Sequence, residues 1–418
     1  MAGLSAARTL QQAGIRAMVI EARDRVGGRI HTIHHGDEVI ELGAEFIHGR
    51  PPDLWQLVKE ADLDTYELGG DDLCHENGEL KKCDEHDETV GFLDQLLSWK
   101  GPDSPFSEYP PLKTLAPDQR DQVINYVQSF NAADYRQIGV HALAVQQQAE
   151  DEIESDTIFR IRDGYALLPE YLADDLRKAG VRIELNTRVD DIEWQRGAVE
   201  VHAETLEGPM QYRAQRAVIA LPLGVLHQRA VAFKPFPPTL AQADRLRMGP
   251  VRRFTLLFKD RFWAQQESVQ FPNLSFLFAQ DAMPPVWWTP HPAYSTSLTG
   301  WIGGPRSSAF DEFTPAQLGE TACRELAKIF SLPSDFIKAQ LISCLSHDWQ
   351  LDPFSRGAYS YVPAGALPAV LALATPVEHT LYFAGEHTDV TGHWGTVHAA
   401  LRSGVRAAQQ IIAAPHTA

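Results

Sequence analysis

The most informative stretch of the chain is Leu381-Tyr-Phe-Ala-Gly-Glu386-His-Thr388, followed by His393-Trp-Gly-Thr-Val-His-Ala-Ala-Leu-Arg-Ser-Gly404-Val-Arg-Ala-Ala408. The first part predicts a short buried strand that stops at a glycine and an acid. The second part predicts a helix entered through Gly395 and Thr396, because apolar residues then recur at spacings of three, four and seven. A helix N-terminus carries unpaired N–H groups and the positive end of the helix dipole. An anionic or electron-accepting group is therefore expected there.

The beginning of the chain contains part of a second pattern that is typical of a dinucleotide-binding site. Residues 1–14 predict a helix that stops at Gly14, and residues 15–20 predict a short, almost wholly apolar strand that ends at Glu21. Gly27, Gly28 and Arg29 follow closely. A helix, a glycine, a strand and an acid form the second half of a dinucleotide-binding βαβ unit, in which the acid binds a ribose and the glycines approach a pyrophosphate.

The first half of that unit is not in the sequence. The fingerprint G-x-G-x-x-G needs a strand and two glycines before Gly3, which would be its third glycine, the one that permits close helix–strand packing. Because everything downstream is intact, we expect the sequence to be a fragment or to start late.

The middle of the chain divides into two patterns. Residues 52–150 read as mostly helical, and residues 181–221 read as short strands of a β-meander that returns to the first sheet. Residues 228–363 predict a second lobe on a mostly antiparallel sheet, with a helix at 316–330 and a strand at 338–345. This segment holds five tryptophans, each of which is more simply explained as core than as part of a binding pocket.

Composition excludes several classes of protein. Among 418 residues there are 37 basic and 55 acidic side chains, and a net charge of −18 argues against nucleic acids and anionic membranes as partners. No run approaches the roughly 20 apolar residues of a membrane span. The four cysteines have no zinc or redox spacing, so we expect free thiols in a reducing compartment, no metal site and a cytoplasmic protein.

Four motifs in one order resemble the flavin-containing amine oxidases, which include monoamine and polyamine oxidases and the related histone lysine demethylase. They are Gly3 to Arg29, Gly43-Ala44 with His48-Gly49, Trp349 to Tyr361, and Phe383 to Val397. The resemblance implies an α/β fold of two lobes, with residues 1–60, 155–226 and 364–418 binding FAD. Residues 61–154 and 227–363 would form a mixed sheet-and-helix substrate domain.

The resemblance also implies a set of FAD contacts. Glu21, with Arg23 nearby, would hold the adenosine ribose, Gly43 and Ala44 would lie against the isoalloxazine, and the backbone of Val189 would meet the adenine. The full set comprises Gly3, Glu21, Arg23, Gly27, Gly28, Arg29, Gly43, Ala44, Val189, Trp349, Glu386, Thr396, Val397 and Ala400.

The implied chemistry is transfer of a hydride equivalent from the carbon beside an amine to the flavin, with dioxygen reduced to hydrogen peroxide. Gly357-Ala358 stands where covalent monoamine oxidases carry the cysteine that bonds the flavin, so we expect non-covalent FAD. Tyr359 would face the substrate side of the flavin, and His48 would lie on the path of the amine. Arg253 replaces the usual lysine of the family, and Ala399 replaces a common glycine.

The sequence leaves two alternatives to an amine oxidase. An L-amino-acid oxidase would need a cation for the substrate carboxylate, and Arg253 is the one candidate. A non-catalytic flavin-binding or partner-binding remnant of an oxidase would be disabled by its missing phosphate loop. A desaturase of the same superfamily fits the Trp349–Tyr361 block less well. The sequence leaves the identity of the amine, the oligomeric state and the electron acceptor open.

Overall fold

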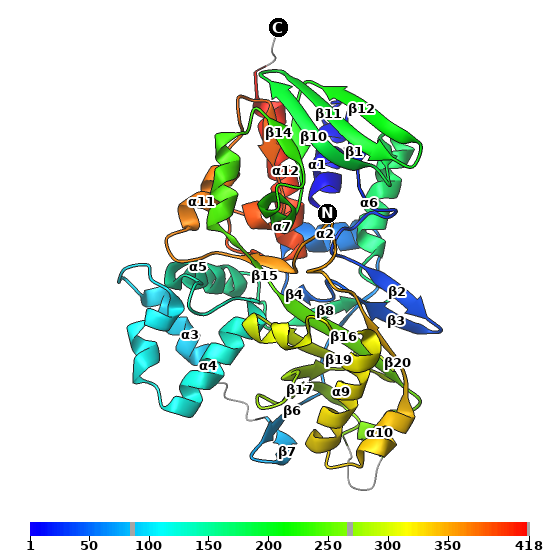
Figure 1. Ribbon diagram of the computed structural model, residues 1–418, viewed down its shortest axis with the longest axis vertical. Helices are drawn as coiled ribbons and strands as arrows, with labels where there is room; N and C mark the ends of the chain where they lie inside the picture. Colours follow the sequence, from blue (N-terminus) through cyan, green and yellow to red (C-terminus); the bar gives the residue numbers. More distant parts are fainter. Residues whose placement is uncertain (84–87, 266–270, 416–418) are drawn as a thin grey trace.

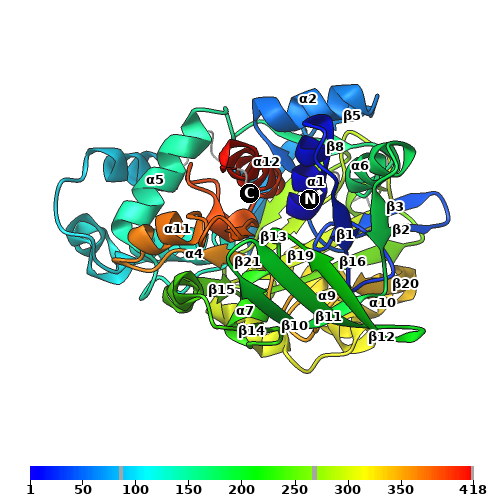
Figure 2. The ribbon, with the colours of Figure 1, turned by 90° about the horizontal axis from the view of Figure 1, so that it is seen from above.

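Two helices from opposite ends of the chain pack side by side in the upper lobe. In the computed structural model, which describes residues 1–83, 88–265 and 271–415, helix α1 (Ala2–Gln12) lies along α12 (Val397–Ala413), as Figures 1 and 2 show. The hydroxyl of Ser5 donates to the carbonyl of Leu401 at 2.9 Å, across this contact. Both predicted helices are confirmed.

Short parallel strand pairs lie against these helices. Strand β1 (Met18–Ile20) pairs with β9 (Arg182–Glu184), and β13 (Ala217–Ile219) pairs with β22 (Leu381–Phe383). Helix α1 packs against both β1 and β13, and α6 (Leu167–Lys178) packs against α1. The strand predicted from the Leu381 stretch is fully buried, as a strand covered on both faces must be.

The predicted β-meander is confirmed at the top of Figure 1. Strands β10 (Arg188–Gln195), β11 (Ala198–Thr205) and β12 (Gly208–Ala214) are antiparallel neighbours. Strand β14 (Ala232–Lys234) adds to β10 in parallel, so the chain stays with the upper lobe beyond residue 226. Helices α7 (Leu223–His227), α11 (Leu367–Leu373) and the 3-10 helix η4 (Pro238–Arg245) share its apolar core.

The lower lobe is built on a seven-stranded sheet. Its order is β20 (Leu341–Ser346), β16 (Val251–Phe258), β19 (Ser297–Gly303), β18 (Val286–Trp288), β17 (Leu274–Phe278), β6 (Asp71–Glu76) and β7 (Glu79–Lys82). One face, with Phe254, Leu256 and Phe258, packs on α9 (Pro315–Ile329). Side chains alternate along a strand, so Arg253 and Thr255 lie on the opposite face, toward the upper lobe.

Smaller elements join the lobes. Strands β4 (Ile47–His48), β8 (Ile158–Ile161) and β5 (Thr65–Glu67) form one sheet, and β15 (Arg247–Gly249) pairs with β21 (Tyr359–Tyr361). Strands β2 (Thr32–His35) and β3 (Glu38–Glu41) form a hairpin. Helix α2 (Pro52–Glu60) packs on α12 and shares its core with α1 and α6. A separate apolar core unites α3 (Glu88–Leu93), α4 (Pro117–Phe130), α5 (Val140–Asp151) and the 3-10 helices η1 (Asp94–Ser98), η2 (Phe106–Glu108) and η3 (Pro110–Thr114).

Two element predictions are wrong. Residues 52–150 are not mostly helical throughout, because β5, β6 and β7 lie within them. Asn77 and Gly78, at φ of 52° and 81°, form the hairpin turn between β6 and β7, and an Asn-Gly pair is the sequence signal for such a turn. The strand predicted at 338–345 begins only at Leu341, since α10 (Ser334–Gln340) occupies the residues before it.

The prediction of four free thiols is wrong for two of them. Cys74 and Cys83 form a disulfide, with Cα atoms 5.0 Å apart, because the β6–β7 hairpin brings them opposite each other. Cys323 and Cys344 are free. Sequence spacing alone could not reveal the pair, since the hairpin itself was not predicted.

We expect protein purified without reductant to show two titratable thiols after denaturation, and four after reduction. Cys74→Ser should show three thiols without reductant, because Cys83 loses its partner. Cys323→Ser, a matched control, should show one. Four thiols in the unreduced wild-type protein would contradict the disulfide.

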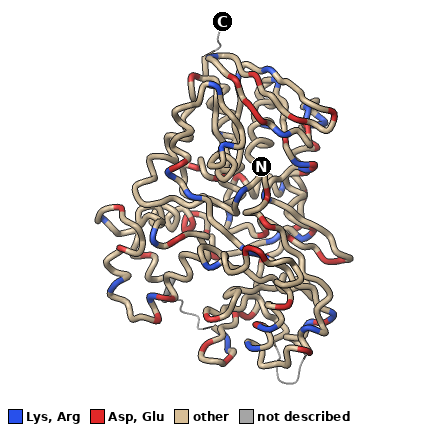
Figure 3. The backbone as a smooth tube through the Cα atoms, in the orientation of Figure 1, with Lys and Arg blue, Asp and Glu red and all other residues tan. Residues whose placement is uncertain are grey.

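Basic and acidic residues are interspersed over both lobes in Figure 3. Within the described ranges, the chain contains no helix with the length and apolar character needed to cross a bilayer.

Candidate active site

Glu386 connects three separate segments at the base of the upper lobe. Its carboxylate accepts hydrogen bonds from Arg29 Nη1 at 2.9 Å, from the backbone N–H of Gly395 at 3.0 Å, and from both the backbone and the hydroxyl of Ser360. Burial on its own would raise the pKa of the Glu386 carboxyl. Arg29, His387 and Ser360 outweigh that effect and hold the pKa below its ordinary value, so Glu386 is ionised.

The predicted helix N-terminus forms directly beside this network. Thr396 is the N-cap of α12, and its hydroxyl accepts a hydrogen bond from the backbone N–H of Ala399 at 3.1 Å. Gly395, Thr396, Val397 and Ala400 are partly exposed, whereas Ala399 is fully buried. The first turn of α12 thus presents one open face on an otherwise buried helix.

Replacing Thr396 with alanine should lower the free energy of unfolding by about 1 kcal/mol, because the cap to Ala399 is lost. Thr396→Ser keeps a hydroxyl at the same place and should retain most of the stability. Urea unfolding of the three proteins measures the difference. Equal losses for serine and alanine would mean that the hydroxyl does not cap the helix.

The glycine-rich segment after β1 folds against the neighbouring motif. Gly27 and Gly28 adopt φ of 99° and 61°, which L side chains rarely adopt. A Cβ on Gly43 would lie 1.9 Å from the Arg29 carbonyl oxygen, so only glycine permits this approach. Trp349 lies on the same glycine, and its indole N–H donates to the Leu42 carbonyl at 2.8 Å.

Other predicted cofactor residues occupy differing environments. One Glu21 oxygen accepts from the backbone N–H of Arg23 at 2.9 Å, which aims this carboxylate across the end of β1. The Arg23 guanidinium binds Asp352 through two nitrogens, at 2.8 and 2.7 Å, and also Ser355, so its role toward a cofactor stays a prediction. Val189 lies at a β-bulge in β10. A Cβ on Gly3 would lie 3.8 Å from Ala220, an ordinary contact, so packing within this chain does not require glycine there.

The residues present fit a dinucleotide. With the exception of buried Trp349 and Glu386, every predicted FAD residue is partly exposed, although these residues lie on four separate segments. Nothing stands within 4 Å of a Cβ built on Gly28. Arg253 Nε is buried without a hydrogen-bond partner among the described residues. A bound dinucleotide would approach the open backbone at the glycines. It would also supply hydrogen-bond partners for the carboxylate and for the buried unpaired donor.

An aromatic collar lies between the sheet and α12. We use this name for Phe46, His48, Phe130, Trp288, Trp301 and Tyr359, which form a closed circuit of contacts. Ring centroids are 5.4 Å apart for Phe46–Trp288, 5.9 Å for Trp288–Trp301 and 6.4 Å for the stacked Trp301–Tyr359 pair. The Tyr359 hydroxyl donates to the Phe130 carbonyl at 2.7 Å, and His48 lies 6.0 Å from both Phe130 and Phe46.

The collar is neutral. Burial lowers the pKa of the His48 imidazole to about 4, against a smaller opposite effect of the Ser155 backbone, so His48 is uncharged at neutral pH. Burial also raises the pKa of the Tyr359 phenol. Five of the six side chains are only half-buried or exposed, Trp288 being the exception. A contiguous, partly exposed aromatic set of this kind is typical of a surface that binds an apolar group.

Behind the collar lies a buried charge cluster of Glu45, Arg160 and Arg253. The Glu45 carboxylate pairs with Arg253 and, at 3.0 Å, with Arg160, and it accepts the indole N–H of Trp288 at 3.1 Å. Arg253 also donates to the Gly43 carbonyl, and its guanidinium carbon lies 5.5 Å from the centre of the Trp288 ring. Arg253 is thus held between the predicted flavin segment and the collar.

Sequence reasoning missed part of this site. Glu45 was not singled out, although it lies between Ala44 and His48 in a quoted motif, and an acid inside that apolar turn was a usable signal. Trp263 and Trp287 are core, as predicted. Trp288 and Trp301 instead lie in the collar, and Trp349 contacts Gly43. Arg160 and Phe130 carry no local signal, because their partners are distant in the sequence.

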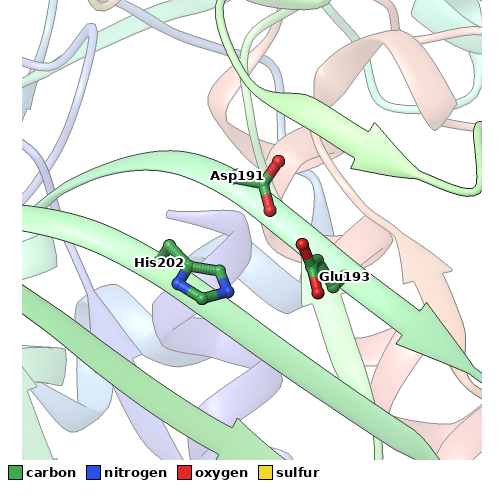
Figure 4. A group of neighbouring side chains, drawn as sticks. All are labelled: Asp191, Glu193 and His202. Atoms are coloured by element: carbon green, nitrogen blue, oxygen red, sulfur yellow. The ribbon is translucent and has the colours of Figure 1, made fainter.

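A further set of possible ligand atoms lies on the meander. In the described parts of the chain, Asp191, Glu193 and His202 offer ligand atoms within 4.8 Å of one another. Figure 4 shows these three side chains on neighbouring strands. The ammonium of Lys234 lies 2.7 Å from Asp191 and 3.4 Å from Glu193. Because an ammonium group of the protein already pairs with both carboxylates, we assign no metal there.

Comparisons with known proteins agree on one family. A family model described as flavin containing amine oxidoreductase matches residues 1–113 and 101–412. A lysine-specific histone demethylase 1 homolog 2 from Arabidopsis thaliana is 28% identical over 454 residues, which cover 99% of this chain and 57% of that protein. Polyamine oxidase 4 from Oryza sativa subsp. japonica is 28% identical over 451 residues, which cover 98% of this chain and 86% of that protein.

Solved structures share the fold. A putrescine oxidase bound to putrescine superposes with a TM-score of 0.78 at 22% identity, covering 99% of this chain and 97% of that one. Cyclohexylamine oxidase from Brevibacterium oxydans gives 0.79 at 23% identity, covering 98% and 96%. The predicted α/β fold of two lobes is therefore confirmed. Similarity at these identities does not identify the substrate of this chain.

Proposed function

Because this chain belongs to the flavin containing amine oxidoreductase family, whose cofactor is FAD, we propose that it oxidises a primary or secondary amine. The observation that carries the proposal is the contact between the aromatic collar and the two segments predicted to hold the flavin. The aromatic collar adjoins Gly43 through Arg253 and Trp288, and Gly395 packs on the Tyr359 ring. An apolar substrate surface thus meets both segments predicted to hold the flavin.

The residues that would hold FAD divide by role. Glu21 would bind the adenosine ribose, Arg29 and the Gly27–Gly28 backbone the pyrophosphate, and the first turn of α12 the pyrimidine end of the flavin. Bound FAD would supply the two-electron acceptor. We propose that it is non-covalent, because the free thiols Cys323 and Cys344 lie on α9 and β20, away from the collar.

The protein groups orient the substrate and exclude water. Tyr359 and Trp301 would position the carbon beside the amine, as a near-attack geometry requires. Neutral His48 offers a hydrogen-bonding nitrogen without adding a charge to the path of the amine. The positive end of the α12 dipole would stabilise negative charge that develops at the pyrimidine end of the flavin.

The amino-acid oxidase alternative loses support. Both terminal nitrogens of Arg253 are engaged, one with Gly43 and the other with Glu45. Its remaining donor, Nε–H, is the one that bound FAD would satisfy, so this side chain offers little to a substrate carboxylate. We propose dioxygen as the acceptor, with hydrogen peroxide as product.

The test is anaerobic mixing of the FAD-loaded protein with amines, followed by visible absorption. We expect the oxidised flavin spectrum to bleach with at least one amine and to recover on admission of oxygen, with peroxide formed in equal amount. A flavin spectrum that no amine bleaches would overturn the proposed activity. Bleaching by α-amino acids in preference to the corresponding amines would favour the L-amino-acid oxidase alternative.

A further inference from the structure

We propose that the preferred substrate is an amine with a single cationic nitrogen and an apolar substituent, aromatic or alicyclic, rather than a diamine or polyamine. This inference rests on the proposed function and concerns the substrate class of the same site. It follows from the composition of the aromatic collar and from the charge cluster behind it.

The carboxylate that is bonded to the collar is not available to a second ammonium group. Among the described residues, Glu45 is the one acid hydrogen-bonded to a collar side chain, through Trp288. The side chain of that acid is 3% exposed and already pairs with two guanidinium groups, those of Arg253 and Arg160. A buried ammonium without a counter-charge is strongly disfavoured, so a distal amine would gain nothing here.

The charge cluster offers no net negative charge to attract a second cation. One carboxylate against two guanidinium groups leaves a net charge of +1. The other titratable groups that face the cluster are Glu41 and Tyr66. Burial raises the pKa of Glu41 to about 7, so its ionisation brings the cluster from +1 to neutral and no further. At no neutral or mildly alkaline pH does the region behind Trp288 become negative.

The collar favours an apolar group in place of that second ammonium. The partly exposed rings of Phe46, Trp301 and Tyr359 offer faces and edges at the spacing that aromatic pairs adopt. A ring on the substrate would cover them and remove apolar surface from water.

The first experiment compares amines that differ in one feature, using anaerobic bleaching of the FAD-loaded wild-type protein. Hexylamine and hexamethylenediamine differ only by the distal amine, at a pH where that amine is protonated. We expect the ratio of limiting rate to dissociation constant to be at least about tenfold higher for hexylamine, mostly through the dissociation constant. Phenethylamine and cyclohexylamine should match or exceed hexylamine, and spermidine should be among the poorest.

The second experiment changes the charge behind the collar. Arg160→Met leaves Glu45 and Arg253 as a neutral pair and frees one carboxylate oxygen. We expect the preference for hexylamine over hexamethylenediamine to shrink severalfold. Arg162, which directly follows β8, is exposed and paired with Asp64, so Arg162→Met is the control and should leave the preference unchanged. An unchanged preference in a folded, flavin-loaded Arg160→Met protein would remove the charge cluster from the explanation.

The outcomes separate this inference from the proposed function. Faster bleaching by diamines or polyamines than by the matched monoamines would overturn the inference and leave amine oxidation standing. Failure of every amine to bleach the flavin would overturn the proposed function, and the inference with it. The wild-type comparison decides the matter even if Arg160→Met does not fold.

Discussion

Glu386→Ala is expected to be purified largely without FAD and to unfold at a clearly lower denaturant concentration than the wild-type protein. The substitution removes the acceptor for Arg29, for the Gly395 N–H and for two donors of Ser360. Leaving the partly buried Arg29 without its ionic partner and the other donors unsatisfied costs on the order of 3–5 kcal/mol. The cofactor should also be lost, because Arg29 and Gly395 are residues that would contact it.

The ratio of flavin to protein absorbance and a urea unfolding curve measure the two effects. Ser360→Ala removes one donor only and should fall between the wild-type protein and Glu386→Ala. Glu207→Ala removes an exposed acid at a turn of the meander and serves as the charge-matched control. Full flavin content in Glu386→Ala would mean that the carboxylate organises neither the helix N-terminus nor Arg29 for the cofactor.

Glu45→Gln should destabilise the protein far more than Arg253→Met. Removal of the carboxylate leaves two buried guanidinium groups facing each other, at a cost of about 3–5 kcal/mol. Removal of Arg253 leaves Glu45 paired one-to-one with Arg160, whose other neighbours are Tyr66 and Glu41. The larger loss of stability is therefore expected for Glu45→Gln, because this variant leaves the cluster with two unpaired positive charges.

A double-mutant cycle measures this coupling directly. The Glu45→Gln/Arg253→Met protein should be more stable than the sum of the single losses implies, because one of the two unpaired cations is gone. Urea midpoints of the four proteins give the coupling free energy. Additive losses, or a larger loss for Arg253→Met alone, would contradict the pairing.

Local signals in the sequence were sufficient where one segment determines its own structure. The spacing after Gly395 predicted α12 and its entry at Thr396, and the acid after an apolar run predicted the placement of Glu21 at the end of β1. The meander was similarly readable, because its turns and strands are neighbours along the chain.

Signals failed where two distant segments determine each other. Strand β6 contains charged residues and pairs with β17, roughly two hundred positions away, so its own composition did not predict a strand, although Asn77-Gly78 was a local signal for the hairpin with β7. Arg253 was interpreted as a possible partner for a substrate carboxylate. Its actual partners, Gly43 and Glu45, belong to the first part of the chain and could not be inferred from the residues around it.

The packing of α1 on α12 has a consequence for biosynthesis. A ribosome adds about 5–20 residues per second, so roughly 20–80 s pass between completion of α1 and the arrival of its partner helix. Over that interval Leu4, Ala6 and Leu10, which are buried in the finished protein, have no α12 to cover them. The lower lobe, whose core lies mostly within residues 254–337, can assemble earlier during translation. The upper lobe is therefore expected to close last, and nascent chains stalled before α12 should be the ones that chaperones retain.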